Sequence, residues 1–398
     1  MPPNAGARAA EGVARASYGR LLAVLAAPTG DIPAAEDALA DAFERALANW
    51  PASGIPDNPE GWLLTVARNR LRDLFKSSAV KTGVKLHDVH TVFHDLDFDA
   101  IPDKRLELLF VCAHPAIDAG IRTPLMLQTV LGFESAQIAV AFAVPEAAMA
   151  QRLVRAKRRI RDARIPFTIP LRHDMAARLP AVLEAIYGAY AIDWMAVAGT
   201  TERDSLAAES LYLAITLASL LDTEPEAYGL AALISLSMSR AVARAGGVPL
   251  DEQDPRLWDA ALITQGESLL RRAHTFDRVG RFQLEAAIQS VHCARIDGGE
   301  TDFIALRKLY EALVLVAPTL GARVSLAATI GEVDGPEAGL AVLEAIEAPR
   351  FQPAWATRAH LLAAAGRVDA AREAYAKAIS LTTDAETRAR LRQKARGL

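Results

Sequence analysis

Apolar residues recur at spacings of three and four along almost the whole chain, which is the period of an amphipathic α-helix. Alanine and leucine dominate these segments, and the strict alternation of apolar and polar residues that is typical of β-strands is rare. Clusters of Gly, Pro and Asp interrupt the pattern and mark turns, for instance at 27–33, 50–61, 199–205 and 245–255. The pattern therefore predicts an all-α fold.

The turns and polar stretches divide the helical pattern into three parts. We expect one small helical bundle over 15–76 and a second over 104–165. Residues 77–103 between them are polar and acidic with few helix signals, which is typical of a linker. A large helical domain is expected over 171–398.

The end of the large domain has the pattern of a helical repeat. The segment "AWATRAHLLAAAGRVDAAREAYAKAISLT" pairs two helices about a turn at Gly366. Ala370, Tyr375 and Ala378 stand where a tetratricopeptide repeat carries a small, an aromatic and a small residue. Stacked helix pairs usually present a concave binding face, so a partner or ligand surface is expected here.

The strongest local signal is a run of cations near the end of the second bundle. Between 152 and 164 the chain holds seven Lys or Arg and one acid. A helix that begins at Pro145 places an apolar face opposite these cations. That face consists of Met149, Leu153, Ala156 and Ile160.

The residues before this basic helix predict a DNA-binding layout. They indicate a helix, a turn at Gly132, a short helix over 135–142 and a tight turn into the basic helix. In a helix-turn-helix the second helix enters the major groove, where its first residues meet base edges and later cations meet phosphates. We expect Glu146, Ala147, Ala150, Gln151 and Arg152 to face bases, and Arg155, Lys157, Arg158, Arg159 and Arg161 to take phosphates. The alternative is a solvated basic helix.

A second basic cluster lies in "NPEGWLLTVARNRLRDLFKSS". If this segment is a helix, its pattern predicts that Trp62, Val66 and Leu74 face the protein interior and that a polar set faces solvent. The polar residues are Arg68, Asn69, Arg72 and Lys76. An aromatic ring beside cations and an amide suits bases that have left the duplex stack. The alternative is a buried tryptophan under a solvated face.

An acidic helix is expected over 34–50. Its acidic face consists of Glu36, Asp37, Asp41 and Glu44, and Leu39, Phe43 and Leu47 lie opposite. Such a face repels DNA and fits a basic protein partner. The alternative is an ordinary amphipathic helix with no partner on its acidic face.

Composition narrows the class of protein. The chain has 398 residues, 52% hydrophobic and 23% charged, with a net charge of −4. No apolar run reaches the length of roughly 18–20 residues that a membrane span needs, and the first residues lack the apolar core of a signal peptide. Two cysteines argue against a disulfide framework and favour a reducing cytoplasm.

Enzyme and metal chemistry have little support in the sequence. No phosphate-binding loop, dinucleotide fingerprint or nucleophile elbow is present. The residues that could suggest a metal site are His87, His90, His94, Cys112 and His114, but no paired-ligand spacing supports them. Polar and aromatic residues of the large domain could line a small-molecule pocket, although mutually satisfied packing is the alternative: Gln253, Asp254, Trp258, Gln283 and His292. We therefore expect no enzyme, no cofactor and no metal.

The order of these segments resembles bacterial sigma factors of the extracytoplasmic-function type, which contain only the second and fourth sigma regions. The match is closer to a subgroup with a C-terminal tetratricopeptide-like domain. It covers nearly the whole chain. Stretches that carry it include "AEDALADAFERALANWPASGIPDNPEGWLLTVARNRLRD", "QIAVAFAVPEAAMAQRLVRAKRRIRDARIPF", "FQLEAAIQSVH" and "TDFIALRKLYEAL".

The resemblance implies a role for each segment. The acidic helix would dock on core RNA polymerase through Glu36, Asp37, Asp41 and Phe43. The helix from Trp62 to Lys76 would read and help melt the −10 element, and the helix over 144–161 would read the −35 element as duplex DNA. The C-terminal domain would regulate activity, with a regulatory protein or ligand as its partner. The competing hypothesis is a one-component helix-turn-helix regulator with a sensing domain, which would bind operators without polymerase.

Overall fold

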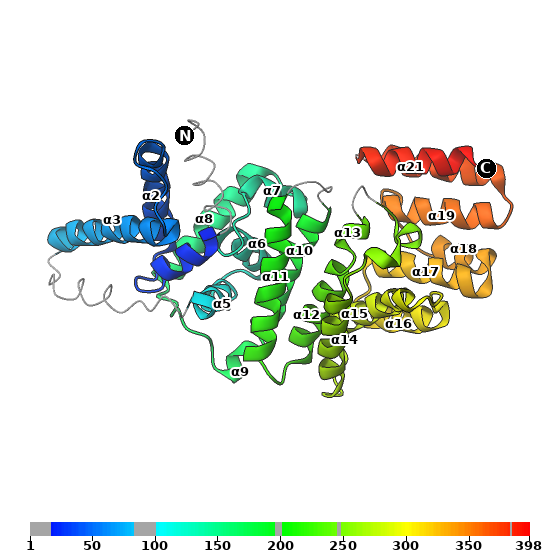
Figure 1. Ribbon diagram of the computed structural model, residues 1–398, viewed down its shortest axis with the longest axis horizontal. Coiled ribbons are helices and arrows are strands. Elements are labelled where there is room, and N and C mark those ends of the chain that lie inside the picture. The colour runs from blue at the N-terminus through cyan, green and yellow to red at the C-terminus, as the bar shows by residue number, and fades with distance from the viewer. Residues whose placement is uncertain (1–16, 83–100, 196–200, 245–247, 383) are drawn as a thin grey trace. The chain divides into compact units, whose positions relative to one another are not determined.

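The computed structural model describes residues 17–82, 101–195, 201–244, 248–382 and 384–398. Every regular element in these ranges is a helix, and no strand occurs among them, which confirms the all-α prediction (Figure 1). The chain folds into two compact units. Unit 1 comprises Met1–Met195 and Glu202–Thr216, and unit 2 comprises Ala196–Thr201 and Leu217–Leu398.

Unit 1 begins with a helix over residues 17–26. The elements that follow are α2 (Ile32–Ser53), α3 (Pro59–Thr82), α5 (Ile101–Cys112), α6 (Ala119–Thr129), α7 (Ser135–Ala141), α8 (Glu146–Asp162), α9 (Arg172–Met175), α10 (Leu179–Met195) and most of α11 (Thr201–Leu220). Helix α3 extends six residues into the segment that the sequence predicts as a linker. The part of that segment over 83–100 lies outside the described residues.

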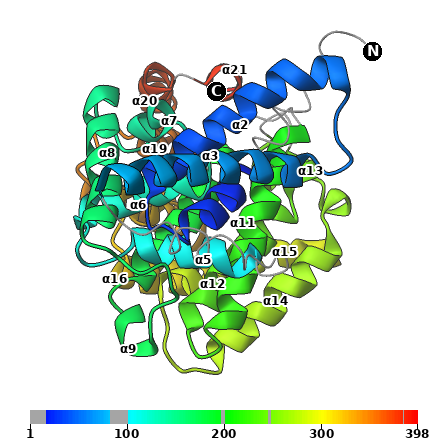
Figure 2. The same cartoon turned by 90° about the vertical axis from the view of Figure 1, so that its left-hand side faces the viewer.

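Helices α2 and α3 pack on one another and cross (Figures 1 and 2). The Asp31 carboxylate caps the start of α2 by accepting a hydrogen bond from the Ala34 N–H at 3.1 Å. The helix ends at Gly54, where φ is 86°. Fully buried Leu39, on α2, and Leu71, on α3, belong to the core of this pair.

Helices α5, α6 and α10 form the other part of unit 1. Helix α10 is apolar around almost its whole circumference and packs on α5 and α6, with Gly188 facing Leu127. The Arg178 guanidinium donates to the carbonyl of Phe110 on α5 at 3.5 Å. The sequence analysis places residues from 171 onward in a separate domain, whereas in the structure α10 and most of α11 belong to unit 1. An all-round apolar helix needs neighbours on every side, and α5 and α6 supply some of them.

Unit 2 is a succession of helices in chain order. They are α12 (Pro225–Met238), α13 (Ala241–Arg244), α14 (Ala260–His274), α15 (Arg281–Cys293), α16 (Phe303–Val316), α17 (Leu320–Asp334), α18 (Pro336–Glu344), α19 (Gln352–Ala364), α20 (Val368–Leu381) and α21 (Ala385–Arg396), with short 3₁₀ turns Leu250–Glu252, Pro255–Leu257 and Ala294–Asp297. From α14 to α21 each helix packs on the next (Figure 1).

The last helices of unit 2 meet at the turn that the sequence predicts. The turn between α19 and α20 contains Gly366 with φ 73°. Tyr375 and Ala378 are buried against Leu361 and Leu362 of α19, and Ala370 packs on the same cluster. This pair of helices therefore shares one apolar core.

Candidate nucleic-acid and partner interfaces

Helices α6, α7 and α8 follow one another through two tight turns. The first turn contains Gly132 with φ 73°, as the sequence predicts, and the second contains Ala143 with φ 52°. The start of α7 is fixed by the N–H of Glu134, which donates to the Gln137 side-chain oxygen at 2.9 Å. All three helices pack on one another, so α6 and α7 together hold the orientation of α8.

Helix α8 buries the apolar face that the sequence predicts. Met149, Leu153 and Ile160 are at most 1% exposed and Ala156 is 6% exposed. A 3.6-residue period places the remaining positions on the other sides of the helix. The buried apolar face therefore fixes which sides of α8 carry its polar residues.

The predicted DNA-facing residues of α8 fall into three environments. Exposed are Glu146, Ala147, Gln151, Arg155, Arg158, Arg159 and Arg161, and Ala150 and Arg152 are half-buried. Arg152 donates to the carbonyl of Gly120 at the start of α6, at 3.2 Å. Lys157 differs from all of these because it is buried, with an exposed fraction of 7%.

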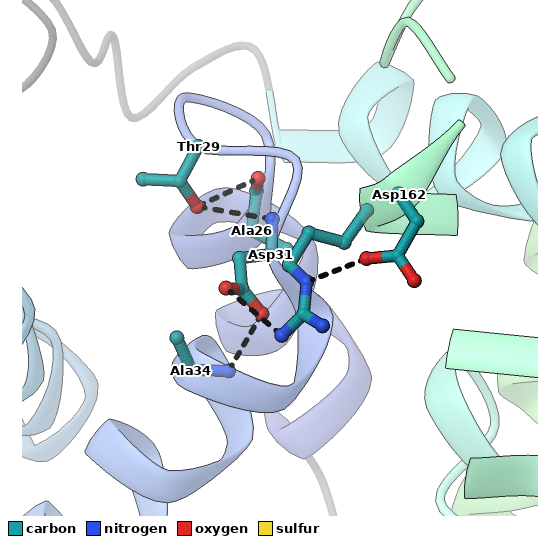
Figure 3. Close-up of polar contacts among 6 residues, drawn as sticks. Ala26, Thr29, Asp31, Ala34 and Asp162 are labelled. Carbon is teal, nitrogen blue, oxygen red and sulfur yellow. Dashed lines mark hydrogen bonds and ion pairs between the residues drawn. The ribbon is translucent and has the colours of Figure 1, made fainter. Parts of the chain in front are cut away.

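Lys157 and Arg161 lie one turn apart on α8 and both contact α2. The Lys157 ammonium is 2.5 Å from the Glu36 carboxylate. The Arg161 guanidinium is 3.9 Å from the Asp31 carboxylate and also donates to Asp162 at 3.1 Å (Figure 3). Two of the cations that the sequence assigns to phosphates are thus directed toward the acidic helix.

A cleft of about 370 Å³ lies between α8 and the start of α6. Its lining combines apolar side chains with three arginines and one aspartate. The lining residues are Ala116, Ile117, Asp118, Ile121, Arg152, Arg155, Ala156 and Arg159. The three arginines outnumber the aspartate, so the cleft is positively charged on balance.

Helix α3 has a different inward face from the one predicted. Its buried residues are Leu63, Leu64, Ala67 and Leu71, whereas Trp62, Val66 and Leu74 are half-buried. The core face is therefore rotated by about one residue from the predicted one. The rotation leaves the Trp62 ring partly accessible, in edge contact with Trp50 at 5.6 Å between ring centroids.

The polar residues of α3 lie away from the buried face of the helix. Asn69 is exposed, and it accepts a hydrogen bond from Arg72 at 2.9 Å. Arg68, Arg72 and Lys76 are half-buried, and burial lowers the pKa of Arg68. The predicted polar set therefore lies beside the partly accessible tryptophan.

The acidic face of α2 is partly engaged within the chain. Asp37 and Glu44 are exposed, whereas Glu36, Asp41 and Phe43 are half-buried. Asp41 pairs with Arg45 at 3.0 Å. Burial raises the pKa of the Glu36 carboxyl, and the Lys157 ammonium opposes that increase.

The residues considered for metal or small-molecule binding have other surroundings. His87, His90 and His94 lie outside the described residues, and no group of three or more metal-ligating side chains occurs among the described ones. His114 accepts the N–H of Ala116, and the buried Cys112 thiol lies 3.4 Å from the Thr129 hydroxyl.

In unit 2 the candidate pocket residues are engaged with their own neighbours. Gln283 binds Glu226, Asp254 binds Arg256, and Gln253 donates to the Val248 carbonyl. The guanidinium of Arg295 lies over the ring of Trp258.

Two residues of these surfaces were missed by the sequence analysis. Asp31 is both the N-cap of α2 and the partner of Arg161 (Figure 3). Its position just before Ile32-Pro33 is a helix-start signal that could have identified the cap. Trp50 is the aromatic partner of Trp62, and no local signal connects the two because they are on different helices.

Unit 1 thus combines an acidic helix, a basic helix with a partly accessible tryptophan, and a cationic helix that follows two tight turns. Comparison with known proteins identifies one of its regions. Residues 13–80 match sigma-70 region 2, and residues 178–274 match a family of unknown function (DUF6596). The chain is 36% identical over 375 residues to the uncharacterized protein R00370 of Rhizobium meliloti (strain 1021), covering 90% of this chain and 89% of that protein. No solved structure matches it.

The chain therefore contains a sigma-70 region 2 over residues 13–80 and belongs to one family with the Rhizobium protein R00370. The region 2 match spans helix 17–26, α2 and most of α3, which are the elements that carry the acidic face and the Trp62 surface. Among the described residues, no helix is long and apolar enough to cross a membrane.

Proposed function

We propose that this protein is a cytoplasmic sigma factor of the extracytoplasmic-function type that directs core RNA polymerase to specific promoters. Region 2, over 15–76, binds polymerase through α2 and the melted −10 element through α3. Region 4, over 104–165, is a helix-turn-helix that binds the −35 element through α8. The observation that carries this proposal is the region 2 match followed, in the same unit, by the exposed arginines of α8.

Run-off transcription with purified bacterial core polymerase and fragmented genomic DNA tests this function. We expect discrete transcripts that depend on the protein. Arg158→Glu should reduce them at least tenfold, because it reverses one charge on the exposed side of α8 and repels phosphates. Arg392→Glu is the matched control, since Arg392 is an exposed arginine of α21 in unit 2. Footprints on duplex DNA without polymerase, and no transcripts with it, would favour a one-component regulator instead.

The accessible Trp62 ring gives a second test of the same function. Trp62→Ala should weaken binding to single-stranded −10 DNA within the holoenzyme, by roughly 1–3 kcal/mol per stacked base. Binding to a duplex fragment that contains only the −35 element should not change. Equal losses on both probes would mean that the substitution damages the fold.

We also propose that the tetratricopeptide-like helices of the C-terminal domain, predicted over 171–398, modulate promoter use by binding a regulatory protein or ligand. The successive packing of α14 to α21 supports this, because stacked helices present extended binding surfaces. A truncation that ends after Asp222 retains α10 and α11, which unit 1 needs for its own core. We expect the truncated protein to remain folded and to transcribe at an altered rate, whereas a truncation after 170 should aggregate because it exposes the α5–α6 surface.

A further inference from the structure

A groove of about 370 Å³ lies between the end of α18 and the start of α19 in unit 2. Leu343, Ile346 and Ala354 contribute buried apolar surface to its lining, and each of them is at most 9% exposed. The Trp355 indole also lines the groove and donates a hydrogen bond to the Pro349 carbonyl at 3.1 Å, which ties the connection between the two helices to α19. The shape of the groove is therefore set by packed and hydrogen-bonded groups.

Two glutamates give the groove an acidic side. Glu344 is the last residue of α18, Glu347 follows shortly after it, and both line the groove and are exposed. Within the described part of the chain neither of these carboxylates has an ion-pair partner, whereas Glu337 at the start of α18 pairs with Arg367 at 3.7 Å. Both carboxylates are therefore available to a partner outside the chain.

The place of these carboxylates at a helix end is electrostatically unfavourable in the free chain. The last turn of α18 contains no basic residue, and a helix C-terminus has a partial negative charge of its own. The lining contains one cation, Arg358, whose guanidinium lies over the Trp355 ring at 5.8 Å from the ring centroid. The two glutamates outnumber this arginine, so the groove is negatively charged on balance and favours an added cation.

A lysine or arginine side chain of a partner matches both properties of the groove. Such a side chain has an aliphatic stem that packs on apolar surface and a charged head that stays near solvent. The stem would contact Leu343 and Ile346 while the head meets Glu344 and Glu347. A small amine fits less well, because small-molecule sites bury about 70–90% of their ligand, whereas several lining residues of this groove are exposed.

We propose that the groove between α18 and α19 binds a segment of a protein partner in which a lysine or arginine stands beside an apolar residue. This inference rests on the proposed function for its consequence, since it gives the regulatory partner of the C-terminal domain a site and a chemistry. The contact brings a cation to the negative end of α18 and covers apolar surface. Binding should therefore weaken as the salt concentration rises without being abolished, because salt screens the charges and not the apolar contact.

Selection of a displayed library of random peptides on the full-length protein tests the groove. We expect the enriched peptides to share a lysine or arginine next to an apolar residue, and to be lost when the double variant Glu344→Lys with Glu347→Lys replaces wild type. A synthetic peptide of the enriched sequence should bind the double variant about tenfold more weakly in fluorescence anisotropy, because both charges of the site are reversed. The double variant should be at least as stable as wild type, since a cation suits a helix C-terminus.

Glu373→Lys with Glu386→Lys is the matched control, since it makes the same change of charge at exposed positions of α20 and α21. Replacement of the basic residue of the peptide by norleucine, which keeps an aliphatic stem and lacks the charge, should weaken binding to wild type and not to the double variant. No enriched peptide, enriched peptides without a basic residue, or equal losses in the double variant and the control would overturn the proposed groove.

Run-off transcription with and without the synthetic peptide separates this inference from the proposed function. The transcript yield should change for wild type and stay constant for the double variant. If the peptide binds and the wild-type yield does not change, the groove stands and its role in promoter use is refuted. If the chain does not join core polymerase at all, the proposed function fails, and the binding measurements still decide whether the groove takes a basic segment.

Discussion

His292, on α15, should make unit 2 sensitive to mild acid. Burial, together with the positive charges of Arg240 and Arg295, lowers its pKa from 6.5 to about 4. The unfolded chain therefore binds a proton at a higher pH than the folded chain does. Stability is fully present above pH 6.5, falls as the pH drops below that value, and levels off near the folded pKa.

The size of the effect follows from the two pKa values. Each pKa unit corresponds to about 1.4 kcal/mol, so the whole shift is worth at most about 3.5 kcal/mol. Between about pH 7.5 and about pH 5.5 the expected loss is about 1.3 kcal/mol of the free energy of unfolding. This interval avoids most carboxylate titration, which occurs at lower pH.

Urea unfolding at the two pH values, followed by circular dichroism, measures this loss. His292→Gln removes the titrating group and keeps a polar side chain of similar length. Between the two pH values, the variant should therefore lose about 1.3 kcal/mol less of its free energy of unfolding than wild type does. His274→Gln, at an exposed position of α14, should behave as wild type. Parallel losses in wild type and His292→Gln would refute the assignment of the acid sensitivity to this residue.

Further substitutions test the packing of each unit. Gly339→Val should destabilise unit 2 by about 2–3 kcal/mol in thermal unfolding, because a Cβ there meets the Ala327 carbonyl oxygen at 2.7 Å. Unchanged stability would show that α17 and α18 can move apart without a free-energy cost. Gly321→Ala, with no neighbour closer than 4.0 Å, should instead stabilise by up to about 1 kcal/mol. Glu209→Gln should lower the free energy of unfolding of unit 1 by about 2–4 kcal/mol in urea, because it leaves the buried Arg105 guanidinium without its counter-charge. A decrease below about 0.5 kcal/mol would show that water reaches this pair.

The local hydrophobic pattern was sufficient to predict the helices and most of their buried faces. The apolar face of α8 and the turn at Gly132 follow from periodicity and from the one residue that adopts positive φ without strain. The turn at Gly366 was predicted for the same reason. Each of these features depends on residues within about two helical turns of one another.

Contacts between distant segments could not be predicted in this way. The burial of Lys157 depends on Glu36, which is 121 residues away in the chain, so the charge pattern of α8 alone placed Lys157 among the phosphate contacts. The inward face of α3 consists of Leu63, Leu64, Ala67 and Leu71 and leaves Trp62 half-buried, and the pattern of α3 alone does not specify which of its apolar residues face α2. The membership of α10 in unit 1 likewise depends on the surfaces of α5 and α6, which no pattern within α10 specifies.

The chain-order packing of α14 to α21 has a consequence for how this protein can change in length. A helix in such an array is buried by its immediate neighbours, so removal of an end helix exposes one face of one neighbour, whereas removal of an inner helix exposes faces on two. Insertions and losses of whole helical hairpins should therefore accumulate beyond α19 in homologous genes. The stretch from α12 to α15, where α12 packs on both α14 and α15, should keep a constant number of helices.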